Sequence, residues 1–302
     1  MRNLSRLMAA AVLLSLLAAC GAAAPGGTAG SGTTIKVGSK NFTEEFILGE
    51  LYAQLLEANG FTVEKKLNLG ATPIAHQALV NKEIDLYPEY TSTGLLEVLK
   101  APQQSDRQAI FNTVKSEYEK QYQLTWLEPA PFNNTNTFAM KKDRAEALGI
   151  KTYSDLAQKA GELVLGGPPE FLEREDTKSL FETYGGFPFK EVRQLDPGLR
   201  YQALLDGQVD VVVAFGTDGQ IGGYDLLVLE DDKNFYPPYQ VAPVIHQDTL
   251  QANPRIAEIL NELAPKLDDT TMAKLNWMVD GPDKREPAAV ARQFLIDQGM
   301  LK

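Results

Sequence analysis

An internal repeat is the strongest constraint on how this chain can fold. Residues 76–94 align without gaps with residues 201–219, and each copy opens with the same Gln-Ala-Leu run. Two further segment pairs keep nearly the same offset, residues 61–69 with 187–195 and residues 35–42 with 163–171. Three matches in one order predict two copies of a single structural unit.

Each copy has the pattern strand, helix, strand, helix, strand. In the first copy, residues 35–37 read as a strand, and we expect Thr43 to cap a helix whose first turn carries two glutamates. Residues 61–67 read as the second strand, 73–80 as the second helix and 84–86 as the third strand. This alternation predicts an α/β fold with a parallel sheet covered by helices on both faces. Two such units make two lobes.

Segments outside the repeat predict a hinge between the lobes. Residues 124–127 and 137–140 read as strands between the copies, and residues 243–246 read as a strand after the second copy. Three helical patterns then follow, at residues 254–267, 270–279 and 286–298. We expect a clamshell with two hinge-crossing strands. Its predicted lobe 1 comprises residues 34–133 and 238–302, and its predicted lobe 2 comprises residues 134–237.

The N-terminal region predicts export and membrane anchoring. Arg2 and Arg6 precede an apolar stretch, residues 8–17, that is too short to span a bilayer, so residues 1–19 read as a signal peptide. The run Leu-Ala-Ala-Cys that ends at Cys20 resembles the lipobox of bacterial lipoproteins. The resemblance implies cleavage before Cys20 and a lipid on its sulfur; an ordinary signal peptide that happens to contain a cysteine is the alternative. Residues 20–33 are rich in Gly, Ala, Ser and Thr, which predicts a flexible tether.

Composition excludes several classes of site. Forty acidic against 29 basic residues give a formal charge of −11, which disfavours nucleic acid as a partner. Two histidines, His76 and His246, and one cysteine exclude zinc fingers, Cys-His nucleophile pairs and disulfide scaffolds. The sequence contains no Walker loop, G-x-S-x-G or H-E-x-x-H motif, so we expect no cofactor, no metal and no catalytic residue. A glycosidase-like pair of carboxylates stays open on spacing alone.

The expected ligand site lies at the carboxyl ends of the strands, where open α/β sheets bind their ligands. Tyr90 and Phe215 occupy matched places in the two copies, beside small polar residues. Aromatic faces attract quaternary ammonium groups, and Arg or Lys side chains bind carboxylates. Each of these residues alone also fits a core or surface position. Together they favour the binding of a zwitterionic betaine over catalysis.

Four blocks of the sequence resemble the osmoprotectant substrate-binding proteins of ABC importers, a family that handles glycine betaine, choline and carnitine. The blocks are residues 38–61, 84–95, 195–204 and 228–244, and the resemblance extends over residues 35–301. It implies the type II periplasmic-binding-protein fold. It also implies a small-molecule solute as ligand, and an ABC permease with its ATPase as separate partners.

The resemblance also assigns individual residues. Tyr90 and Tyr239 match two walls of the family's cage of four aromatic side chains. Phe215 stands where members usually have tyrosine, which keeps the ring and loses the hydroxyl. Asn136 stands where many members have tyrosine, which removes a wall and inserts an amide. The positions that the family uses for the ligand's carboxylate and other polar contacts fall on Lys40, Thr93, Asn134 and Arg174.

We therefore expect a monomeric substrate-binding protein at the outer face of the cytoplasmic membrane or in the periplasm, with no membrane contact except its lipid anchor. It would capture a small quaternary-amine or betaine-like solute and deliver it to the permease. The incomplete aromatic cage also fits a different small polar or cationic solute. An extracytoplasmic enzyme that reuses the clamshell, and a sensory or adhesion module, are the rival hypotheses.

Overall fold

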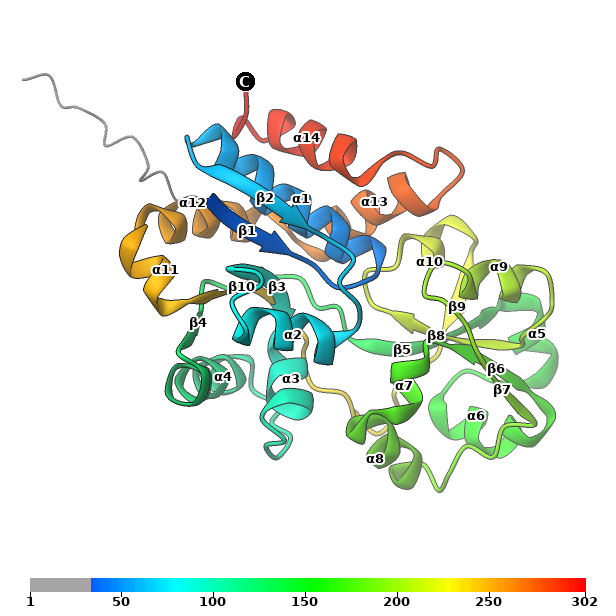
Figure 1. Ribbon diagram of the computed structural model, residues 1–302. Coiled ribbons are helices and arrows are strands. Elements are labelled where there is room, and N and C mark those ends of the chain that lie inside the picture. The colour runs from blue at the N-terminus through cyan, green and yellow to red at the C-terminus, as the bar shows by residue number, and fades with distance from the viewer. Residues whose placement is uncertain (1–33) are drawn as a thin grey trace, which may run out of the picture.

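Figure 1 shows the computed structural model, which describes residues 34–302 as two lobes, each built on a five-stranded sheet. The predicted signal peptide and Cys20 lie outside these residues. The first sheet has the order β2-β1-β3-β10-β4, and the second has the order β7-β6-β8-β5-β9. The strands of the first sheet are β1 (Thr34–Gly38), β2 (Thr62–Lys66), β3 (Leu86–Tyr90), β4 (Leu124–Trp126) and β10 (Val241–His246). Those of the second are β5 (Asn136–Lys141), β6 (Val164–Gly167), β7 (Glu191–Gln194), β8 (Val211–Phe215) and β9 (Leu226–Val228).

The two sheets share one connectivity, as the repeat predicts. In the first, β1 pairs in parallel with β2 and β3; in the second, β6 pairs in parallel with β7 and β8. The parallel pairing predicted for the repeat unit is confirmed, and a strand from outside each unit adds to it in the opposite direction: β10 runs antiparallel to β3, and β5 runs antiparallel to β8. Both antiparallel strands begin where the chain arrives from the other sheet, through residues 127–135 and residues 229–240.

The third strand of the first unit extends further than predicted. We expected it at residues 84–86, whereas β3 comprises Leu86–Tyr90 and contains Pro88, although a proline in the middle of a strand removes a ladder hydrogen bond. The structure tolerates Pro88 because β1 pairs with β3 only at Leu86, and Pro88 lies opposite another proline, Pro243, in β10. As a result Tyr90 is the last residue of its strand, as Phe215 is of β8.

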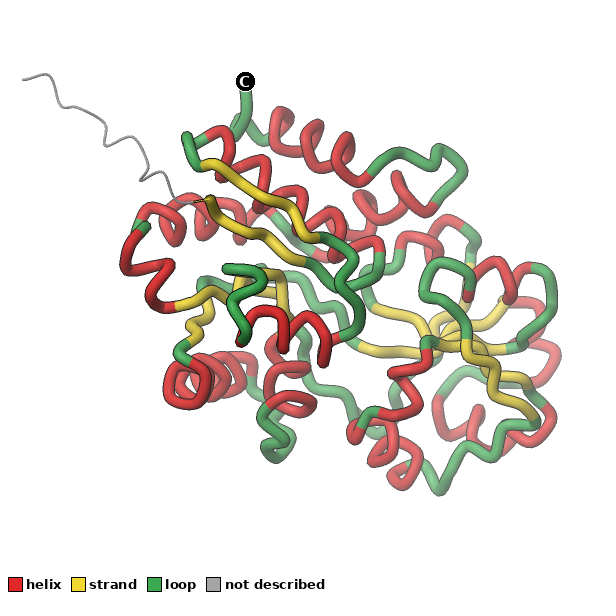
Figure 2. The backbone as a smooth tube through the Cα atoms, viewed as in Figure 1, coloured by secondary structure: helices red, strands yellow, loops and turns green. Residues whose placement is uncertain are grey.

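Helices cover both faces of the first sheet (Figures 1 and 2). On one face, α1 packs with the three C-terminal helices over a core that includes Ile35 and Val37. On the other face, Tyr118 and Trp126 belong to a second core beneath α2 and α4. The helices of this lobe are α1 (Thr43–Ala58), α2 (Thr72–Val80), α3 (Thr91–Thr93), η1 (Gly94–Val98), α4 (Arg107–Tyr122), α11 (Gln247–Ala252), α12 (Arg255–Leu263), η3 (Ala264–Lys266), α13 (Asp269–Asp280) and α14 (Pro287–Asp297).

The second sheet is covered in the same way. Phe138, Leu165 and Val211 face one core, and Tyr201 and Val212 face the other. The helices of this lobe are α5 (Lys142–Leu148), α6 (Tyr153–Lys159), η2 (Ala160–Glu162), α7 (Pro169–Glu173), α8 (Glu175–Thr183), α9 (Arg200–Leu205) and α10 (Gly219–Gly223). Nowhere in residues 34–302 is a helix both long and apolar enough to cross a bilayer.

The lobes also touch where α10 packs against α13. The approach is close because α10 contains glycines: a Cβ atom at Gly219 would lie 2.5 Å from the backbone nitrogen of Trp277. Gly222, in the same short helix, has open space around it. Glycine at position 219 therefore lets the second lobe approach α13 of the first lobe.

Candidate functional site

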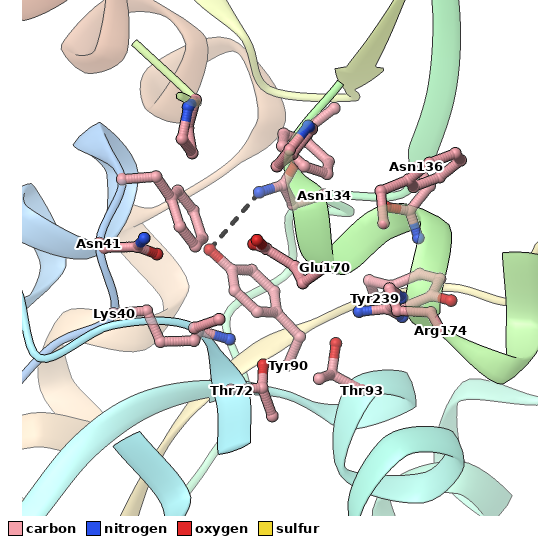
Figure 3. Close-up of a pocket in the computed structure, with 16 residues that line it drawn as sticks. Lys40, Asn41, Thr72, Tyr90, Thr93, Asn134, Asn136, Glu170, Arg174 and Tyr239 are labelled. Carbon is pink, nitrogen blue, oxygen red and sulfur yellow. Dashed lines mark hydrogen bonds between the residues drawn. The ribbon is translucent and has the colours of Figure 1, made fainter. Parts of the chain in front are cut away.

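A cavity lies between the lobes, bordered by residues that follow β1 and β6 and by the last residues of β3 and β8 (Figure 3). The structure brings all eight predicted ligand-binding residues to this cavity; their contact with a ligand stays a prediction. They are Lys40, Tyr90, Thr93, Asn134, Asn136, Arg174, Phe215 and Tyr239. Eight residues outside the predicted ligand-binding set also line it: Asn41, Phe42, Ala71, Thr72, Pro168, Glu170, Phe171 and Pro197.

Three aromatic rings form a stack that passes from one lobe to the other. The ring centroids of Phe42 and Tyr90 are 6.3 Å apart with planes at 22°, and those of Phe42 and Phe215 are 6.1 Å apart with planes at 28°. These separations are those of aromatic rings in direct contact with one another. The sequence contained a signal for Phe42, because it stands in the same segment after β1 as Lys40.

Tyr239 belongs to a separate group of polar contacts, beside Arg174 in Figure 3. The Arg174 guanidinium donates to both carboxylate oxygens of Asp176, with Nε at 2.8 Å from Oδ1, and the Tyr239 hydroxyl donates to Oδ2 at 2.8 Å. Burial alone would lower the pKa of Arg174, but the hydrogen bonds and charge of Asp176 outweigh it and raise that pKa. Arg174 thus enters the cavity as a charged group held by a buried carboxylate that the sequence analysis missed.

Lys40 is also paired with carboxylates of its own lobe. Its Nζ lies 2.6 Å from Glu89 and 3.8 Å from Glu45, and 4.6 Å from the centroid of the Tyr90 ring. Burial raises the pKa of Glu45 to about 8, although the charge of Lys40 acts in the opposite direction. Lys40 therefore places an ammonium that is ion-paired with Glu89 against the ring that was predicted to contact the ligand's cation.

Glu44, in the first turn of α1, accepts hydrogen bonds from residues of the cavity wall and from a residue of the second lobe. It is 3% exposed, and its Oε1 accepts hydrogen bonds from the Tyr90 hydroxyl and the Asn134 amide, each at 2.7 Å. Its Oε2 accepts from Thr217 in the second lobe at 2.5 Å and from Asn276 in α13 at 2.8 Å. Burial raises the pKa of Glu44, and these hydrogen bonds oppose part of that rise. In the sequence, Glu44 stands out only as one of two carboxylates in the first turn of a helix.

The remaining predicted residues come from both sides of the cleft. Thr93 ends α3, and Asn136 begins β5, where it pairs with Phe215. None of the residues that line the cavity in the described part of the chain is His, Cys or Ser. Groups of three or more His, Cys, Asp or Glu that could hold a metal ion are absent from residues 34–302. The arrangement offers ring faces, amides and charged groups for binding a small polar solute.

Comparison with known proteins gives a family match over most of the chain. The profile of the substrate-binding domain of ABC-type glycine betaine transport systems matches residues 33–297. Because the match spans nearly every described residue, it covers both sheets and every segment that lines the cavity.

Several characterised proteins are similar to this chain. The glycine-betaine-binding protein of Pseudomonas aeruginosa is 36% identical over 301 residues, which cover 96% of each chain. The carnitine transport binding protein of Listeria monocytogenes is 34% identical over 274 residues, covering 90% of this chain and 89% of the relative. An ergothioneine transport permease/ergothioneine binding protein of Helicobacter pylori is 36% identical over 87% of this chain, and the chain spans 47% of that protein.

Solved structures agree with this picture. The crystal structure of a glycine betaine/carnitine/choline ABC transporter aligns with a TM-score of 0.72 at 31% identity, over 89% of this chain and all of that chain. The ligand-free structure of YehZ from Escherichia coli aligns with a TM-score of 0.65 at 31% identity, over 89% of this chain and 99% of that one. The alignments therefore include both lobes.

Proposed function

Because the chain belongs to the family of substrate-binding domains of ABC-type glycine betaine transport systems, we propose that its interlobe cavity captures a small quaternary-amine or betaine-like solute. The predicted family, the two-lobed fold and the function as a substrate-binding protein of an ABC importer for glycine betaine or carnitine-type solutes are confirmed. Proteins of this family are extracytoplasmic, bind small solutes and deliver them to a permease.

The chemical groups of these solutes match the side chains that line the cavity. Glycine betaine, carnitine and ergothioneine, the compounds in the relatives' names, each carry a trimethylammonium group and a carboxylate. Ring faces attract such a cation without needing an N–H donor. A guanidinium binds a carboxylate through paired hydrogen bonds. The observation that carries the proposal is that Tyr90 and Phe215, matched in the repeat, meet through Phe42 at the cavity wall beside Arg174.

We assign roles to the cavity residues on this basis. The rings of Phe42, Tyr90, Phe215 and Tyr239 are proposed to contact the trimethylammonium group. Arg174 has five N–H donors, and Asp176 accepts from two of its nitrogens, so donors remain for the solute's carboxylate. Lys40 is proposed to assist as a cation whose charge is balanced by Glu89. The amides and hydroxyl that complete the polar contacts are those of Asn134, Asn136 and Thr93.

Calorimetric titration tests the proposal. Purified protein would be titrated with glycine betaine, carnitine, choline and ergothioneine, with proline and glycine as amines that lack a quaternary nitrogen. We expect saturable heat from at least one quaternary amine and none from glycine. If none of the four quaternary amines binds, the proposed solute class is wrong, whatever the fold.

Lobe closure and monomeric state are further parts of the proposal. Residues 34–133 and 238–302 are proposed to move as one lobe against residues 134–237, because binding in an interlobe cleft favours the closed arrangement. Small-angle scattering with and without saturating ligand measures this as a fall in the radius of gyration, and light scattering reports the mass. An unchanged radius of gyration on ligand binding would contradict lobe closure. A dimer mass would contradict the monomeric state.

Membrane anchoring through Cys20 and the absence of catalytic activity are the last two parts of the proposal. Lipidation at Cys20, outside the described residues, is proposed from the lipobox-like sequence, and mass spectrometry of membrane-extracted protein would detect the added acyl mass. A Cys20→Ser variant would move to the soluble fraction. The protein is proposed to return its solute unchanged, and a solute that is chemically altered after long incubation would favour the enzyme hypothesis. An ATPase and a permease encoded beside this gene are expected partners.

A further inference from the structure

Glu170 is the one cavity residue whose charge has no counterpart in the described part of the chain. It lies in α7, and its carboxylate makes no hydrogen bond or ion pair with any of residues 34–302. It lines both the cavity and an outer groove that adjoins it along Thr72 and Arg174. Figure 3 shows its side chain extending from α7 toward the centre of the lining residues.

The other charges at the cavity are already balanced. Lys40 is paired with Glu89 at 2.6 Å, and Arg174 is paired with the buried Asp176. A buried pair of opposite charges has little net field at a distance, whereas a single carboxylate in a partly desolvated cleft acts at full charge. When the charged residues that line the cavity are counted together with their ion-pair partners, the negative charge of Glu170 is left unbalanced.

We infer that Glu170 makes the cavity discriminate between solutes by their net charge, and favours quaternary amines with a net charge of +1 over zwitterionic betaines. This inference rests on the proposed function. A trimethylammonium group has no N–H, so Glu170 acts on it through charge rather than through a hydrogen bond. The carboxylate of a betaine is repelled by Glu170 while its ammonium is attracted, so the two effects largely cancel. The preferred class is quaternary amino alcohols and carboxyl-esterified betaines.

Matched pairs of compounds test this directly. Choline and glycine betaine share a trimethylammonium-methylene head and differ by a hydroxymethyl group against a carboxylate. Carnitine is a zwitterion and its methyl ester has a net charge of +1, so this second pair differs in net charge in the same way as the first. For each pair, the ratio of the cation's affinity to the zwitterion's affinity would be measured by calorimetry on the wild type and on Glu170→Gln. We expect the ratio to fall by about tenfold or more in Glu170→Gln, because one full charge near the ligand is lost.

Glu173→Gln is the control, because it removes the same charge from the same helix at an exposed residue that does not line the cavity. It should leave both ratios unchanged, since water and salt screen an exposed charge. If both members of a pair bind and Glu170→Gln leaves their ratio as in the wild type, the role of Glu170 is wrong while the proposed function stands. An equal effect of Glu173→Gln would also contradict it. If no quaternary amine binds, the proposed function fails and the inference fails with it.

Discussion

The carboxylate of Glu44 in the first lobe accepts a hydrogen bond from the hydroxyl of Thr217 in the second. The same carboxylate holds the hydroxyl of Tyr90, a wall of the cavity. One buried group therefore links the two lobes and also holds a ring that lines the cavity. A charged acceptor makes stronger hydrogen bonds than a neutral one, and an unmet partner is costly when it is buried.

Thr217→Val should weaken ligand binding by favouring the open arrangement. The change removes one of the four donors to Glu44 at nearly constant side-chain volume, and a hydrogen bond to a charged group contributes roughly 1.5–3 kcal/mol. We expect the affinity for the best quaternary amine to fall about tenfold or more, as measured by calorimetry. Thr183→Val, at an exposed helix position of the same lobe, is the control. Wild-type affinity in Thr217→Val would show that this contact does not support closure.

Tyr90→Ala and Tyr90→Phe should separate the ring from its hydroxyl. An aromatic face near a cation contributes roughly 0.5–2 kcal/mol, so Tyr90→Ala should weaken binding by about tenfold. Tyr90→Phe keeps the ring but removes a donor from Glu44, so its main effect should be a lower thermal unfolding midpoint. Calorimetry and thermal denaturation measure the two effects. Equal binding by wild type and Tyr90→Ala would refute the assignment of this wall.

Arg174→Ala should weaken the binding of solutes that carry a carboxylate more than the binding of choline, because only a carboxylate uses the remaining N–H donors of the guanidinium. Affinities for glycine betaine and choline would be compared in wild type and variant, and we expect the betaine to lose roughly tenfold more. The variant also leaves Asp176 with fewer donors, so the unfolding midpoint should drop. Arg193→Ala, which breaks an exposed ion pair with Glu191 in the same lobe, is the control for charge. Equal losses for both solutes would contradict the role of Arg174.

Gly219→Ala should disturb the contact between α10 and α13. A methyl group there meets the backbone of Trp277 and Ala273, which cannot move aside as a side chain can. We expect weaker ligand binding and a larger radius of gyration in the ligand-bound form. Gly222→Ala adds the same methyl group to the same helix where nothing lies within 4 Å, and should resemble the wild type. Identical behaviour of the two variants would show that the lobes do not depend on this close approach.

Glu45 should make stability fall as the pH rises toward 8. Its folded pKa is raised by burial to about 8 from an ordinary value of 4.5, so the folded state holds the proton more tightly than the unfolded state does. This contribution to stability is therefore complete below about pH 4.5 and is lost as the pH rises through about 8, at about 1.4 kcal/mol for each pH unit between the two pKa values. Glu45→Gln should flatten this part of the profile in chemical denaturation. Parallel profiles for the two proteins would contradict the raised pKa.

The sequence was sufficient to predict the two-lobed architecture, because the same pattern of strands and helices occurs twice in it. The strand order β2-β1-β3 recurs as β7-β6-β8, and both matched aromatics, Tyr90 and Phe215, end their third strands. The third strand of the first unit was placed too early in the chain; whether a strand can continue through Pro88 depends on a neighbouring ladder that the sequence does not display. The antiparallel course of β5 and β10 follows from the crossing between lobes and not from any local pattern.

The site was only partly predictable, for a physical reason. Side chains that follow a strand can be assigned to the cleft by topology, as Tyr90 and Phe215 were, whereas Asn134 and Asn136 were assigned only by the resemblance to the family. Glu44 and Asp176 gain their roles from partners distant in sequence: Thr217 is 173 residues from Glu44, and Tyr239 is 63 residues from Asp176. Glutamates in the first turn of a helix are common, so position alone did not single out Glu44.

The four donors to Glu44 also bear on the order in which the protein becomes functional as it folds. Tyr90, Asn134, Thr217 and Asn276 are supplied by successive parts of the chain, the last of them from α13. Until α13 has packed against the rest of the protein, this buried carboxylate lacks one of its partners and the cavity wall that it supports is incomplete. The two sheets alone therefore do not make a finished receptor, which also needs α13.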